Sequence, residues 1–297
     1  REPIRQPAMN LPGVHHIGAH AMATEFQIFI AGLGEERAQV IGAEVLRDLE
    51  ILEEELSRFR DGSDISRINH LPKGATTPIG EATYDCIALA MDVHAETGGA
   101  FDISIGPLLA VWTTPEHTPR KPSEGELERA RAACGMDKLE LAKGRLEVTV
   151  RGDERWFDLG GIGKGYALDQ MAQALREREV DNALLDAGGS TLLAIGGGPD
   201  GDGWPTGTGL PDAPKIPLKD SALSGSGFSE RGEHVIDPRK GQPVSSAKIN
   251  AWALASSAAL ADALSTAFLI MEEAEIAALC DKHPEIGAIL PDTDTPQ

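Results

Sequence analysis

The sequence has 297 residues, with 47 acidic and 27 basic side chains that give a formal net charge of −20. Such a surface repels nucleic acids and anionic lipids, so neither is expected as a partner. No apolar run approaches the length of a membrane-spanning helix, so no transmembrane segment is expected. The same charge would repel a phosphate ligand, so a phosphate site must supply cations or a metal locally.

The N-terminal part of the chain predicts a lead-in, a strand and two helices. Residues 1–21, with three prolines in the first twelve positions, suit an extended lead-in. Phe26, Ile28 and Ile30 alternate with Gln27 and Phe29, which predicts a strand. Over residues 35–56 the apolar positions step by three and four, which predicts a long amphipathic helix. Ser63 is a good cap for a short helix over residues 64–69.

The next part of the chain carries clear helix-start signals. Residues 81–97 have the spacing of a helix, and a Gly-Gly pair ends it. Pro107 suits the first position of a new helix, and Ser123 with Glu126 forms a capping box for another. Residues 139–150 predict a β-hairpin that turns at a Lys-Gly pair.

Residues 158–169 join a glycine-rich turn to the start of a helix. Four glycines in six positions surround Lys164, and helical apolar spacing follows. Glycine lets a phosphate approach the backbone closely, and the first amides of a helix point at such an anion. Gly165 stands where a Walker loop needs Ser or Thr, and the glycine spacing does not fit a dinucleotide fingerprint. A phosphate-binding turn and a plain glycine-rich connection therefore both remain open.

The C-terminal half predicts short strands, a loop and two helices. Strands are expected over residues 183–185 and 192–195 and near Ile216, His234 and Ala251. Residues 196–217 are rich in Gly, Pro and Asp, which favours a surface loop. Residues 257–271 predict a helix of small residues, and residues 272–282 predict another. No internal repeat or linker interrupts the chain, so one domain is predicted over residues 22–290.

Five motifs in a fixed order carry a family resemblance. They are Ser57-Arg-Phe-Arg-Asp-Gly-Ser-Asp-Ile-Ser-Arg-Ile-Asn69, Gly99-Ala-Phe-Asp-Ile-Ser-Ile-Gly-Pro-Leu108, the turn and helix start at residues 158–169, His234-Val-Ile-Asp-Pro-Arg-Lys-Gly-Gln-Pro243 and Ala261-Asp-Ala-Leu-Ser-Thr-Ala267. The ordered set resembles the FAD:protein FMN transferases, the ApbE-like family, over residues 22–271. The resemblance implies a single α+β domain in which helices flank a mainly antiparallel sheet, with FAD and Mg²⁺ bound in one cleft.

The resemblance also implies a reaction, a partner and a compartment. The family cleaves the pyrophosphate of FAD, transfers FMN to a Ser or Thr hydroxyl of an acceptor protein and releases AMP. A periplasmic or cell-envelope location follows from the family, whereas the lack of a targeting segment in this sequence leaves the cytoplasm open.

Asp262 and Thr266 are the candidate side chains for a metal. They lie four residues apart on a predicted helix, so their oxygens project from one face. That helix is apolar nearly all round and should be buried, where a carboxylate needs a partner. A carboxylate, a hydroxyl and a backbone carbonyl suit Mg²⁺, and the resemblance assigns the carbonyl to Gly161. The alternative is that Asp262 decorates a surface and Thr266 only packs.

The resemblance assigns the remaining site residues. His234 matches a residue of the transfer step, where a neutral imidazole suits a base near neutral pH. Alternatively, His234 only shapes the end of a strand. The positions that match FAD contacts are Met22, Phe59, Ala100, Phe101, Asp102, Asp158, Lys164 and Ile236. Phe59 stands where many relatives carry Tyr, and Ser190 stands where an acidic residue is common.

Two other functions use the same residues. With water as the acceptor, the site would be a Mg²⁺-dependent FAD pyrophosphatase that yields FMN and AMP. A non-catalytic flavin-binding protein is the third possibility, but a protein that only binds has no need of His234, Asp262 and Thr266 together.

Overall fold

The computed structural model describes residues 11–114, 118–142, 144–153, 155–210, 214–227, 235–244 and 250–290. Its centre is a seven-stranded sheet in the order β1-β2-β6-β7-β10-β13-β14, and every neighbouring pair is antiparallel. The strands are β1 Val14–Ala21, β2 Thr24–Ala31, β6 Ala183–Ala187, β7 Thr191–Ile195, β10 Ala222–Gly227, β13 Asn250–Ala255 and β14 Gly287–Ile289. This sheet with its helices confirms the predicted α+β class.

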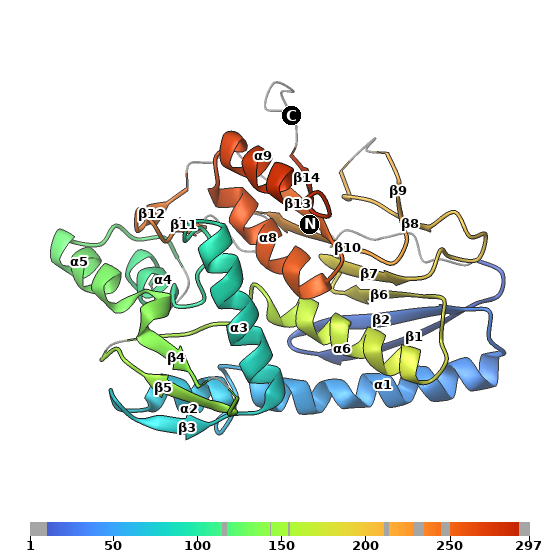
Figure 1. The fold of residues 1–297 in the computed structure, drawn as a ribbon, viewed down its shortest axis with the longest axis horizontal. Coiled ribbons are helices and arrows are strands. Elements are labelled where there is room, and N and C mark those ends of the chain that lie inside the picture. Colours follow the sequence, from blue (N-terminus) through green and yellow to red (C-terminus); the bar gives the residue numbers. More distant parts are fainter. Residues whose placement is uncertain are drawn as a thin grey trace.

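Three helices cover one face of the sheet, as Figure 1 shows: α1 Glu35–Leu56, α6 Gly163–Glu177 and α8 Ala258–Ile270. Alternate residues of β2 supply the strand side of this core, because Phe26, Ile28 and Ile30 are fully buried against the helices. The helices supply small and aliphatic residues to the same core. The predicted helix over residues 35–56 is confirmed at both ends.

The opposite face of the sheet is covered by a second hairpin, β8 Trp204–Thr206 and β9 Ile216–Leu218. Trp204 is completely buried there, and its indole N–H donates to the Ile195 carbonyl. The prediction of a surface loop over residues 196–217 is therefore wrong at β8, whereas the strand expected near Ile216 is confirmed as β9. The many glycines and prolines of this segment are turn signals, and the loop prediction gave them more weight than the one large apolar residue, Trp204.

A second layer lies beside the main sheet. Helix α3 Glu81–Glu96 packs against α8, next to a three-stranded sheet in the order β3-β5-β4 (Figure 1). The other elements are α2 Asp64–His70, β3 Thr76–Pro78, α4 Gly106–Trp112, α5 Glu124–Ala133, η1 Met136–Lys138, β4 Leu139–Leu141, β5 Glu147–Val150, β11 Ile236–Asp237, β12 Gln242–Pro243 and α9 Glu273–Lys282. None of the described helices combines the length and apolar character that crossing a bilayer requires.

Local capping signals were predicted correctly, whereas the start of the chain was not. Ser63 accepts a hydrogen bond from the Ser66 N–H at the start of α2, and Ser123 and Glu126 form the capping box of α5. The predicted lead-in over residues 1–21 is wrong for residues 14–21, which form β1. Three histidines interrupt the alternation of apolar and polar residues in β1. The sequence of this strand therefore lacks the usual strand pattern, although the strand pairs with β2 and buries Ala21. Residues 1–10 of that lead-in lie outside the described residues.

Helices α6 and α8 cap each other. Asp169 of α6 accepts hydrogen bonds from the Ser257 hydroxyl and from the Ala258 and Ala259 N–H groups at the start of α8. In return, Asp262 of α8 accepts a hydrogen bond of 3.1 Å from the Gly165 N–H in the first turn of α6. Each carboxylate meets the positive end of the other helix, so the pair has a fixed relative position.

Gly165 allows these two helices to approach at this point. A Cβ atom added to Gly165 would lie 2.2 Å from the Ala258 carbonyl oxygen and 2.7 Å from the Ala259 Cα. Both neighbours are backbone atoms at the start of α8, which cannot rotate away as a side chain can. The glycine that disqualifies a Walker loop is thus required for packing.

Gly165→Ala is expected to lower the free energy of unfolding by about 1–3 kcal/mol or more, because the added methyl group forces α6 and α8 apart. Gly125→Ala is the matched control, since Gly125 is exposed on α5 and an added Cβ meets only the Arg129 side chain at 3.6 Å. The control should leave stability unchanged or raise it by up to about 1 kcal/mol. Chemical denaturation measures both, and equal midpoints would contradict the close approach.

Candidate functional site

The glycine-rich turn lies directly before α6, which begins at Gly163. The Ile162 and Gly163 N–H groups both donate to the Leu159 carbonyl, which closes the turn. Lys164 follows in the first turn of the helix, half-buried and without an ion pair among the described residues. Its ammonium group and the positive end of α6 therefore favour an anion at this point.

Asp262 stands opposite this turn and is 2% exposed. Its Oδ2 receives the hydrogen bond from Gly165, and no basic side chain in the described part of the chain pairs with it. Thr266 lies one helical turn further on and is half-buried. A buried carboxylate without a basic partner is costly, so this geometry favours a bound cation. The predicted burial of Asp262 is confirmed.

The described residues contain no group of three or more His, Cys, Asp or Glu that could hold a metal. A cation at Asp262 would therefore depend on neutral oxygens as well. Thr266 offers a hydroxyl, and Gly161 offers a backbone carbonyl in the turn before α6. Such a mixed set of hard oxygens suits Mg²⁺ and lacks the imidazole and thiolate ligands that zinc and copper prefer.

A chain of hydroxyls supports Thr266 from inside the sheet. The Ser226 hydroxyl lies 3.3 Å from Thr266 Oγ1 and 2.8 Å from the Ser265 hydroxyl. Ser265 donates in turn to Ser224, 3.4 Å away, and Ser224 lies 2.9 Å from the Thr191 hydroxyl. None of these hydroxyl residues was among the site residues predicted from the sequence. One sequence feature could have indicated them: Ser224 and Ser226 are separated by one residue, and on a strand this spacing places both hydroxyls on the same face.

A second group of site residues surrounds Asp158, at the entrance to the glycine-rich turn. The Asp158 N–H donates to the Ile103 carbonyl over 2.8 Å, so the turn adjoins the loop that carries Ala100, Phe101 and Asp102. Ala100 and Phe101 are buried, while Asp102 accepts hydrogen bonds from the N–H and hydroxyl of Ser104. Burial raises the pKa of the Asp102 carboxyl, although the Ser104 hydrogen bonds act to lower it.

Met22 occupies a strained turn between β1 and β2. Met22 has φ 50° and Ala23 has φ 61°, a left-handed pair that two-residue hairpins usually build from Asn and Gly. The Met22 side chain reaches the start of α6, because its Cε lies 3.7 Å from the position of a Cβ on Gly163. Strain of this kind is retained where the surroundings impose it, often at a ligand site.

Phe59 and Ile236 differ sharply in exposure. Phe59 is 78% exposed in the loop between α1 and α2. Ile236 is buried in β11 with Leu108 and Ala130 of α4 and α5, and no described contact joins it to the glycine-rich turn. His234, the predicted base, lies outside the described residues.

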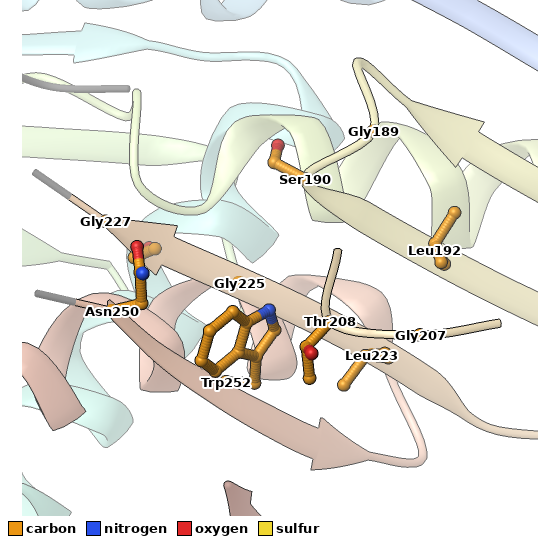
Figure 2. A pocket seen from close by; sticks show the side chains of 11 residues that line it. Gly189, Ser190, Leu192, Gly207, Thr208, Leu223, Gly225, Gly227, Asn250 and Trp252 are labelled. Carbon is orange, nitrogen blue, oxygen red and sulfur yellow. The ribbon is translucent and has the colours of Figure 1, made fainter. Parts of the chain in front are cut away.

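Figure 2 shows a small pocket on the sheet face opposite α8. Ser190, Thr208 and Trp252 line it, and its volume is about 30 Å³. A Cβ added to Gly225 would lie 2.5 Å from the Trp252 indole nitrogen, so this glycine makes room for the ring. This volume accommodates about one water molecule.

The chain is similar to proteins of known sequence and structure over most of its length. The FAD:protein FMN transferase of Klebsiella pneumoniae is 27% identical over 268 residues, which cover 84% of this chain and 76% of that relative. The apo flavinyl transferase ApbE of Pseudomonas stutzeri is 27% identical, with a TM-score of 0.82 over 93% of this chain and 90% of that chain. The ApbE protein of Thermotoga maritima is 28% identical, with a TM-score of 0.79 over 93% and 94% of the two chains. The model of the ApbE family matches residues 22–290, and the chain therefore belongs to the ApbE family.

Proposed function

We propose that this protein is an FAD:protein FMN transferase that depends on Mg²⁺. It transfers FMN from FAD to a Ser or Thr hydroxyl of an acceptor protein and releases AMP. The observation that carries the proposal is the buried Asp262 carboxylate, which meets the first turn of α6 and has no basic partner among the described residues. The named transferase relatives support the same activity.

Mg²⁺ would be held by Asp262, Thr266 and the Gly161 carbonyl. When bound, the ion neutralises charge that develops on the pyrophosphate as a phosphorus–oxygen bond breaks. Asp262 is already fixed by its hydrogen bond from Gly165, and Thr266 is fixed by Ser226, so neither oxygen needs to reorganise when a cation binds.

The rest of the site would bind and orient FAD. Lys164 and the positive end of the α6 dipole would attract the pyrophosphate, and in a chain of net charge −20 this local positive potential is necessary. Met22, Phe59, Ile236 and residues 100–102 would border the ring systems, with Asp158 at the entrance to the turn. We propose these contacts on the family resemblance and on the adjacency of Asp158 to Ile103.

His234 is proposed as the base of the transfer step. The acceptor hydroxyl oxygen bonds to the phosphorus of the FMN half as the bridging bond to AMP breaks, and His234 takes the hydroxyl proton. Water in place of that hydroxyl would give FMN and AMP instead. The exposure of Phe59 favours this second reaction as a competitor, because an open site admits solvent.

Mass spectrometry of a candidate acceptor protein, incubated with this protein, FAD and Mg²⁺, tests the function. We expect the acceptor to gain the mass of FMN less one water, while AMP appears in equal amount. Free FMN and AMP without a modified acceptor would identify the pyrophosphatase. Bound but unchanged FAD with several acceptors would identify a flavin-binding protein and overturn the proposal.

Asp262→Asn tests the metal site. The amide oxygen can still accept from the Gly165 N–H, so the fold should be retained while the charge is lost. Because a bound cation contributes several kcal/mol to the transition state, transfer should fall about 100-fold or more at limiting Mg²⁺. Isothermal titration with Mg²⁺ should show weaker binding in the same variant. Unchanged rate and unchanged Mg²⁺ affinity would exclude Asp262 as a ligand.

His234→Ala should separate binding from chemistry. We expect nearly normal FAD affinity and an unchanged melting temperature, while single-turnover transfer falls by about 10²–10⁴-fold. Raising the pH should restore part of the rate, because the acceptor hydroxyl then loses its proton more readily to solvent. A parallel fall in melting temperature and FAD affinity would show that His234 only shapes its strand.

A further inference from the structure

Arg58, which was not among the site residues predicted from the sequence, contacts Phe59, Trp156 and Asp158. Its guanidinium carbon lies 3.8 Å from the centroid of the Phe59 ring and 4.8 Å from that of the Trp156 ring. Its Nε lies 2.7 Å from Asp158 Oδ2. The Arg58 side chain is only 22% exposed, so this ion pair is partly shielded from solvent.

Phe59 depends on this contact for its position. The ring is 78% exposed, and among the described residues its one recorded ring contact is the Arg58 guanidinium. A planar cation at 3.8 Å covers one face of the ring and holds it by cation–π attraction. The exposure of Phe59 therefore belongs mainly to its other face, which is free to stack on a flat aromatic ligand.

Asp158 connects the same guanidinium to the glycine-rich turn. Its Oδ2 pairs with Arg58, and its Oδ1 accepts a hydrogen bond of 2.9 Å from the Gly160 N–H. Trp156, the other ring that Arg58 contacts, packs directly on Gly106 at the start of α4. A Cβ on Gly106 would overlap the Trp156 side chain. One side chain thus fixes the Phe59 loop to the turn that precedes α6.

We propose that Arg58 is a positioning residue for flavin binding, acting through Phe59. It holds the Phe59 ring with one face open, so that the isoalloxazine ring of FAD stacks there while the phosphates lie at the glycine-rich turn. This inference rests on the proposed function for the identity of the ligand. Lysine in place of Arg58 would keep the charge for Asp158 but lose the planar face that lies on the ring.

A double-mutant cycle of Arg58→Ala and Phe59→Ala tests the inference, with riboflavin and FAD affinities measured by flavin fluorescence titration. Cation–π attraction of this kind corresponds to about 3–30-fold in affinity. Arg58→Ala should therefore weaken riboflavin and FAD by similar factors in that range. In the Phe59→Ala background the same substitution should have almost no further effect on riboflavin, because the ring on which Arg58 acts is gone.

Arg60→Ala is the matched control, because Arg60 lies in the same loop, carries the same charge and pairs with Glu53 and Glu54 instead of a ring. It should leave both affinities unchanged. Arg58→Lys should recover only part of the loss, and it replaces Arg58→Ala in the cycle if the alanine variant does not fold.

Three results would overturn the inference: equal effects of the Arg58 and Arg60 variants, an undiminished Arg58 effect without the Phe59 ring, or a loss for FAD that riboflavin does not share. The last would indicate that Arg58 acts on the phosphates. A wild-type protein that binds flavin but transfers none would refute the proposed function and leave the role of Arg58 standing. No flavin binding at all would refute both.

Discussion

The mutual capping of α6 and α8 is the interaction on which the rest of the site depends. Asp169 receives three hydrogen bonds from the start of α8, which satisfies its carboxylate within the fold. Asp262 receives a single one from the described residues, from Gly165. The two carboxylates have related positions, but Asp262 has more oxygen lone pairs left without a hydrogen bond. Asp169 therefore stabilises the helix pair, whereas Asp262 can also bind a cation.

The site has a rigid end and an open end. At the rigid end Asp262 is 2% exposed, between two helices whose backbones touch at Gly165. At the open end Phe59 is 78% exposed and held by one guanidinium. Chemistry at a phosphate needs fixed charges, whereas entry of a large planar ligand needs an accessible loop. This distribution of burial agrees with the proposed ligand, whose phosphates would lie near the buried carboxylate and one of whose flat rings would lie at Phe59.

Sequence patterns predicted the elements whose signals are local. The capping box of α5 and the spacing of α1 depend on neighbours within one helical turn, and both were correct. Strands β1 and β8 were missed because they are stabilised by contacts outside their own segments. Strand β1 pairs with β2, and Trp204 of β8 packs on the sheet face opposite the helices. Hydrophobic alternation reports burial on a strand only when one face is plainly polar.

The same distinction separates the predictable site residues from the others. Asp262 and Thr266 share a helix face, so four-residue spacing was sufficient to pair them. Arg58 acts on Trp156 and Asp158, about 100 positions further along the chain, and no spacing rule links such positions. Charge does give a physical reason for its presence. In a chain of net charge −20, a weakly hydrated guanidinium that lies over two aromatic rings keeps a cation beside the turn that we propose binds phosphates.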